Sequence, residues 1–262
     1  MLRSLYTAAT GMKANQLYID NISNNLSNVN TSGYKKSKLE FQDLLYQTLV
    51  EPGGSNAEGA KSPQGLQVGL GVRSAANQRI FSQGNLQQTN NPLDVAISGS
   101  GFIQVQMPSG EIGYTRDGSL KVAADGTLVT SNGFPIEPMI QIPEGTKEIS
   151  IDAYGHISVV LDEAGATEEI GQLELAKFLN PAGLKSIGNN QYLATSASGE
   201  AEVDSPGNNG LGTLQQGYQE ASNVELVEEM VSMIIAQRAY EVSSKAIQTS
   251  DSMLQMANQL KS

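Results

Sequence analysis

Four short stretches of the chain have residue types that could support catalysis or ligand binding. Ser32 and Lys35 in "SGYK" have the S-x-x-K spacing in which a lysine helps a serine to attack an acyl group. Gly99 and Gly101 in "ISGSGF" could form part of a phosphate-binding loop, whose backbone N–H groups hold the phosphates. Residues 162–169 ("DEAGATEE") supply carboxylates for a cation, and His156 supplies an imidazole.

None of these stretches has the companions that its chemistry requires. The S-D-N and K-T-G segments that accompany S-x-x-K are missing, and neither "ISGSGF" nor "GLGVRS" at Gly69 has a third glycine that opens a helix. The acidic stretch lacks the ligand spacing of a calcium loop. A single histidine, in a predicted turn, cannot supply a zinc site or a triad that needs a second one. We therefore predict no enzyme activity, no cofactor and no bound metal.

The composition narrows the partners further. The chain has 262 residues, a formal charge of −11 and a pI near 4.6, which argues against nucleic acid or an anionic membrane as the main partner. It has no cysteine, which excludes disulfides and thiol catalysis. No apolar run approaches the roughly 18 residues of a membrane-spanning helix, so we predict no membrane insertion. The N-terminal sequence lacks the apolar core of a secretory signal, so we expect that the protein stays inside the cell or leaves by another route.

Both ends of the chain have the periodicity of long helices. Near the N-terminus, apolar residues recur at steps of three, four or seven until "TSG" at residues 31–33, which predicts a helix about 40 Å long. From Val227 to the C-terminus a similar rhythm recurs, with Met230, Ile234, Ile247 and Leu254 on a neighbouring strip. The simplest prediction is that the two helices pair in a coiled-coil-like terminal domain, either as core packing within one chain or as part of a larger assembly.

The middle of the chain has the pattern of short antiparallel strands. Alternating apolar runs between residues 91 and 203 are separated by turn signals such as "DG" at Asp117 and Asp125. Residues 50–72 are rich in glycine and predict a loop or an extended hairpin. We predict an α+β fold: residues 1–35 plus 218–262 as the terminal domain, 36–80 plus 204–217 as a connector with a Gly-rich arm (46–73), and 81–203 as an inserted β barrel or sandwich.

Two stretches resemble a known family. "NISNNLSNVNTSGYKK" (21–36) and "AQRAYEVSSKAIQTSDSMLQ" (236–255) resemble the axial proteins that build the rod and hook of the bacterial flagellum. The likeness extends along the whole chain, including "SQGNLQQTNNPLDVAISGSGFIQV" (82–105). The arm at 46–73 has no counterpart in the proximal rod protein of similar length. The resemblance therefore favours a distal rod subunit.

This resemblance implies a structural protein that polymerises with itself into a helical rod and transmits torque from the motor to the hook. It implies export by the flagellar type III apparatus and a place in the basal body, where the rod spans the periplasm. The implied partners are further copies of the chain, proximal rod proteins, hook protein, the rings around the rod and the export apparatus. The alternatives are a proximal rod or hook-type subunit, and more remotely a secreted β-domain adhesin with a helical stalk.

Two groups of residues are expected to make contacts between subunits. An arm group consists of Leu49, Val50, Leu66, Val68 and Leu70. In the N-terminal helix, Asn21, Asn24, Asn25 and Asn28 form a stripe beside a stripe of aliphatic residues. We predict that these asparagines fix the register of the helices in a buried interface. The alternative is that they are exposed. The predicted self-assembly interface comprises Leu5, Met12, Ile19, Asn21, Ile22, Asn24, Asn25, Leu26, Asn28, Val29, Val227, Val231, Ile234, Ile235, Val242, Ile247, Met253, Leu254, Met256 and Leu260.

Overall fold

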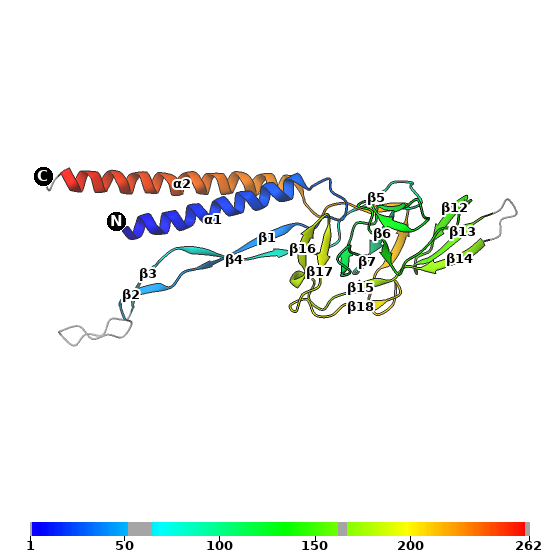
Figure 1. The fold of residues 1–262 in the computed structure, drawn as a ribbon. Helices are drawn as coiled ribbons and strands as arrows, with labels where there is room; N and C mark the ends of the chain where they lie inside the picture. The colour runs from blue at the N-terminus through cyan, green and yellow to red at the C-terminus, as the bar shows by residue number, and fades with distance from the viewer. Residues whose placement is uncertain (1, 52–63, 162–166, 260–262) are drawn as a thin grey trace. The chain divides into compact units, whose positions relative to one another are not determined.

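The computed structural model describes residues 2–51, 64–161 and 167–259 of the chain. Helix α1 (Leu2–Ser27) begins the described part and helix α2 (Leu226–Gln259) ends it, with only short strands and one turn of 3-10 helix between them (Figure 1). All strand pairs with a determined register are antiparallel. The expected α+β class with terminal helices is therefore confirmed.

The chain divides into two compact units. The first unit comprises residues 1–26, 37–78 and 225–262, and the second comprises residues 27–36 and 79–224. This division differs from the predicted three parts, because the Gly-rich arm belongs with the helices. Residues 204–217, expected in a connector, belong to the β-rich unit, where β19 (Thr213–Gln216) pairs with β6 (Val95–Ser98).

The first unit combines the two helices with an extended β ribbon (Figure 1). Strand β1 (Ser37–Asp43) pairs with β4 (Val72–Arg79), and β2 (Tyr46–Val50) pairs with β3 (Leu66–Gly69). In the outer pair Tyr46 lies opposite Gly69 and Val50 lies opposite Leu66, so the predicted hairpin form of the arm is present. Its residues 52–63 lie outside the described residues.

The second unit is built around a sheet of seven strands. Six of its strands follow the order β16-β17-β8-β7-β15-β18, and the seventh, β11, also pairs with β7. The edge strands of this sheet do not pair with each other, so the described strands form open sheets and the expected barrel is wrong. The strands of this sheet are β7 (Phe102–Gln106), β8 (Ile112–Thr115), β11 (Ile136–Glu137), β15 (Leu175–Lys177), β16 (Lys185–Gly188), β17 (Gln191–Leu193) and β18 (Glu202–Asp204).

Smaller sheets complete the second unit. A three-stranded sheet has the order β12-β13-β14, and β9 pairs with β10 and β5 with β20. The "DG" at Asp125 makes the turn between β9 and β10, where Gly126 has a φ of 79° that favours glycine. The remaining elements are β5 (Leu86–Gln88), β9 (Leu120–Val122), β10 (Leu128–Thr130), β12 (Glu148–Ile151), β13 (His156–Val160), β14 (Thr167–Gln172), the 3-10 helix η1 (Pro181–Gly183) and β20 (Tyr218–Glu220).

Two apolar clusters form the core of the second unit. The larger cluster is aliphatic and includes Ile97, Ile103, Leu120, Val159 and Leu175, all buried. The smaller cluster is aromatic, and its rings meet edge to face, as in the Tyr114–Phe178 pair with ring centroids 4.7 Å apart. In the described part of the chain, no helix combines the length and the apolar character needed to cross a membrane.

Candidate assembly surface

Helices α1 and α2 run antiparallel and meet through small and polar side chains. The Oγ atoms of Ser4 and Ser250 are 3.4 Å apart, and a Cβ added at Gly11 would lie 3.7 Å from the Oγ atom of Ser243. At the other end, the Asn25 amide donates a hydrogen bond of 3.3 Å to Glu229. On each helix these contact positions are spaced by whole heptads, so the two helices keep one register along their shared length. The positions of α2 that follow this heptad spacing are Glu229, Ala236, Ser243 and Ser250, and we call them the inner strip of α2.

The large apolar residues of α2 lie away from this inner strip. Ala236 is 1% exposed, whereas Val227 is 72%, Ile235 62% and Val242 69% exposed. Because an exposed apolar face of this kind marks an interaction site, this face of α2 can bury further surface only against a partner. The exposed large residues of this outer face are Leu226, Val227, Met230, Val231, Ile234, Ile235, Val242, Met253 and Met256.

The predicted interface residues therefore have different surroundings. On α2, Ile247 and Leu254 are half-buried and Leu260 lies outside the described residues, while the other predicted apolar residues belong to the outer face. On α1 and the turn after it, Ile22 is buried. Half-buried positions on this side are Leu5, Met12, Ile19, Leu26, Asn28 and Val29.

The asparagine stripe is divided between two environments. Asn21 and Asn25 are buried, and both side-chain amides donate to the backbone carbonyl of Ser37, at 2.8 and 2.9 Å. In return the Ser37 N–H donates to Asn25 Oδ1 at 3.0 Å. These bonds fix the start of β1 on α1, so Asn21 and Asn25 act within the subunit. Asn28 is half-buried and accepts a hydrogen bond of 3.2 Å from the Thr31 hydroxyl. Asn24 is exposed.

The arm presents apolar side chains to solvent. Leu49, Val50 and Leu66 are exposed, while Val68 and Leu70 are half-buried. The sequence interpretation missed two neighbours, Leu45 at 85% exposure and Tyr46 at 55%. Their signal in the sequence is "LLY" (44–46), three large residues in a row at the start of the predicted arm.

A buried charge cluster in the second unit was also missed. The Lys35 ammonium lies 2.5 Å from Glu220 Oε1, and Arg116 Nη2 lies 2.9 Å from Glu220 Oε2. Lys35 Nζ also donates to the Ser82 carbonyl at 2.8 Å, and Arg116 Nη1 donates to the Gly101 carbonyl at 2.8 Å. The cluster joins the segment after α1 to the last strand, β20.

Electrostatics in this cluster keep the carboxylate ionised. Burial by itself raises the pKa of the Glu220 carboxyl, but the charges and hydrogen bonds of Arg116 and Lys35 outweigh it, so this pKa lies below its usual range. Burial and the neighbouring charge of Arg116 lower the pKa of Lys35, which Glu220 opposes. Because Lys35 is paired and fully buried, it cannot serve Ser32 as a base, and "SGYK" is structural here.

The glycine of the same motif is required by backbone geometry. Gly33 has a φ of 68°, and its N–H donates to the Glu220 carbonyl at 2.8 Å. A Cβ added at Gly33 would lie 2.7 Å from the backbone nitrogen of Asp117. A larger residue would therefore push the motif away from β20 and from the segment after β8.

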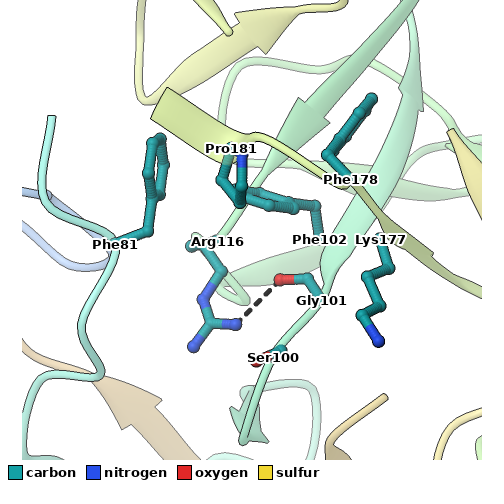
Figure 2. Close-up of a pocket in the computed structure, with 8 residues that line it drawn as sticks. All are labelled: Phe81, Ser100, Gly101, Phe102, Arg116, Lys177, Phe178 and Pro181. Atoms are coloured by element: carbon teal, nitrogen blue, oxygen red, sulfur yellow. Dashed lines mark hydrogen bonds between the residues drawn. The ribbon is translucent and has the colours of Figure 1, made fainter. Parts of the chain in front are cut away.

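Figure 2 shows a small pocket beside this cluster, in which Arg116 bonds to the Gly101 carbonyl below the rings of Phe102 and Phe178. Its volume of about 110 Å³ is below the roughly 300–1,000 Å³ of sites that hold small-molecule ligands. Within the described residues no group of three or more His, Asp or Glu side chains could hold a metal ion.

Comparison with known proteins shows the family of this chain. Residues 5–35 match the model of the flagella basal body rod proteins, 96–159 match that of the flagellar hook protein FlgE/F/G D1 domain, and 215–260 match that of the flagellar basal body rod FlgEFG protein C-terminal region. The flagellar basal-body rod protein FlgG of Borreliella burgdorferi is 51% identical over 263 residues, which cover 100% of this chain and 99% of that relative. This chain belongs to the flagellar basal-body rod protein family.

Other relatives in this family match over similar lengths. FlgG of Buchnera aphidicola from Acyrthosiphon pisum is 50% identical over 99% of this chain and 100% of the relative. FlgG of Caulobacter vibrioides is 46% identical over 100% of both chains. The protein is therefore a structural subunit of the flagellar rod, and it resides in the flagellar basal body. Membership of this family also implies assembly with other rod and hook components.

Proposed function

We propose that the protein polymerises with itself into the distal rod and transmits torque from the motor to the hook. The observation that carries this proposal is the outer face of α2, which is apolar and exposed in the single subunit. Burying apolar surface contributes about 25 cal/mol per Å² removed from water. Neighbouring subunits that cover this face would therefore supply most of the free energy of assembly.

The inner strip supports the same proposal. Packing between α1 and α2 uses serine, alanine and glycine positions, which bury little apolar area. A pair of helices held together in this way leaves its larger aliphatic residues available for contacts with other subunits. Torque then passes between subunits through packed helices rather than through flexible loops.

The arm supports the distal position in the rod. Its paired strands β2 and β3 carry exposed Tyr46, Leu49 and Val50, which a lone subunit would leave in water. We propose that the arm contacts neighbouring subunits and prevents them from sliding, which makes the rod straight and stiff. Proximal rod proteins and hook protein are the proposed axial neighbours. The rings around the rod and the flagellar type III export apparatus are the further proposed partners.

Polymerisation of purified subunits tests this function. We expect the wild-type chain to sediment as straight filaments in electron micrographs, and Ile235→Asp to stay soluble because it places a charge in the outer face. Ser186→Asp is the matched control, since it adds the same charge at an exposed position of the second unit. Curved filaments would favour the hook-type alternative, and normal filaments from Ile235→Asp would contradict the role of the outer face.

A further inference from the structure

A groove in the first unit lies between α1 and the ribbon of β1 and β4. Its volume is about 260 Å³, and its apolar lining comes from Tyr6, Leu17, Leu44 and Val72. Tyr6 and Leu17 are exposed to solvent, although they face a groove rather than a convex surface. A groove of this volume is smaller than sites for small molecules, and it suits a few side chains that project from a partner.

Two positive charges stand at this groove. Lys13 and Arg73 both line it, and none of the ion pairs found among the described residues involves either of them. The only side-chain hydrogen bond found for Arg73 in the described chain goes to the neutral amide of Gln42, at 3.0 Å. A partner that offers aliphatic side chains beside a carboxylate would therefore match both the lining and the charges.

The outer face of α2 carries this combination along one edge. Val231, Ile235 and Val242 follow Glu228 at intervals of three, seven and fourteen residues, so the four side chains share one strip of the helix. All four are exposed. We call them the outer strip.

We propose that the outer strip of one copy docks into the groove between α1 and the β1–β4 ribbon of a second copy. In this contact the aliphatic side chains enter the apolar groove, and Glu228 lies near Lys13 and Arg73 of the neighbour. This inference rests on the proposed function, because it specifies one contact through which the subunits polymerise. It makes the contact heterologous, since groove and strip are different surfaces, and such contacts can extend into a helical polymer.

Disulfide trapping tests the contact directly, because the natural chain has no cysteine. We would prepare Leu17→Cys in the groove and Val231→Cys in the outer strip as separate variants, mix them, polymerise them and oxidise them. We expect a covalent dimer on a non-reducing gel in the polymerised mixture, with at least a fivefold lower yield for either variant alone. The double variant Ser4→Cys/Ser250→Cys is the control, since its sulfurs should join within one chain whether or not it polymerises.

Three results would overturn the inference. Dimers of Val231→Cys alone would show that α2 helices pack on one another. Efficient trapping of Val231→Cys by Leu66→Cys, rather than by Leu17→Cys, would place the arm on the outer strip. Polymers of the mixture without a covalent dimer, while the control pair oxidises, would show that the groove is not the docking site.

Charge reversal provides an independent measurement. We expect Lys13→Glu to raise the subunit concentration needed for polymerisation by about two- to fivefold, the range for an exposed ion pair, and Glu228→Lys in the same chain to restore it. Failure of the second change to restore assembly would contradict the pairing. Failure of the wild-type chain to polymerise under any condition would instead remove the proposed function, and the inference with it.

Discussion

Lys35 and Glu220 lie 185 positions apart in the chain and form an ion pair of 2.5 Å, with their side chains 0% and 1% exposed. Arg116 pairs with the other oxygen of the same carboxylate, Glu220 Oε2. Charges excluded from water to this extent depend on one another, because each would be strongly unfavourable alone. The pair therefore connects the "SGYK" motif to strand β20, so the folding of the second unit depends on both segments.

Removal of the carboxylate should strongly destabilise the second unit. Glu220→Ala leaves Lys35 and Arg116 buried without their counterion, so we expect the free energy of unfolding to fall by about 3–5 kcal/mol. Chemical denaturation followed by circular dichroism measures this loss. The control is Glu202→Ala, at an exposed position of β18, which should change stability by less than about 0.5 kcal/mol. Equal effects of the two substitutions would contradict the importance of the cluster.

The same carboxylate should make stability depend on acid pH. Its pKa is lower in the folded chain than its ordinary value of 4.5, so the unfolded chain binds more protons as the pH falls below that value. The stabilisation is complete above about pH 4.5 and is lost as the pH falls through the lower folded-state pKa. We expect the free energy of unfolding to fall more steeply below this pH in the wild type than in Glu220→Gln. Parallel curves for the two proteins would show that Glu220 does not contribute.

Loss of the Asn25 amide should loosen the junction of α1 with β1. Asn25→Ala removes the bonds to Ser37 and Glu229 and leaves the buried Ser37 N–H unpaired, so we expect a loss of about 1–3 kcal/mol in the first unit. Gln16→Ala is the control at an exposed position of the same helix, with an expected change within about 0.5 kcal/mol. Hydrogen exchange of the first residues of β1 provides the measurement, and unchanged protection in Asn25→Ala would refute the prediction.

Deletion of the arm should make the polymer more flexible without preventing its formation. Removal of Glu51–Leu66 leaves both helices and the β-rich unit in place but removes the outer end of the β2–β3 pair. We expect filaments that bend more, measured as a shorter persistence length in electron micrographs. Replacing the same residues by a Gly/Ser linker of equal length separates the effect of the side chains from that of chain length. Straight filaments from both variants would leave the arm as a surface loop.

Local patterns in the sequence predicted the elements well and their environments less well. The heptad rhythm predicted both helices, and "DG" at Asp125 predicted a turn, because these features depend on neighbouring residues. The register of α1 on α2 could not be predicted, since Ser243 and Ser250 are not distinguishable in an apolar pattern. The pairing of Lys35 with Glu220 depends on a fold that brings distant segments together, and no local signal reports it. Asn21 and Asn25 were recognised as unusual, but their partner, Ser37, lies beyond the helix.

The inner strip has a consequence for how quickly assembly begins. The pair of α1 and α2 meets through Ser4, Gly11, Ser243 and Ser250, so hydrophobic burial between the two helices stabilises it little. Isolated helices are only marginally stable in water. A newly arrived subunit should therefore order its ends most readily on a surface that already exists. We expect polymerisation of purified subunits to show a long lag phase that sonicated seeds abolish. Elongation from an existing tip should be far faster than nucleation of new filaments. Growth would then be confined to the tip, and stray polymers would be rare elsewhere.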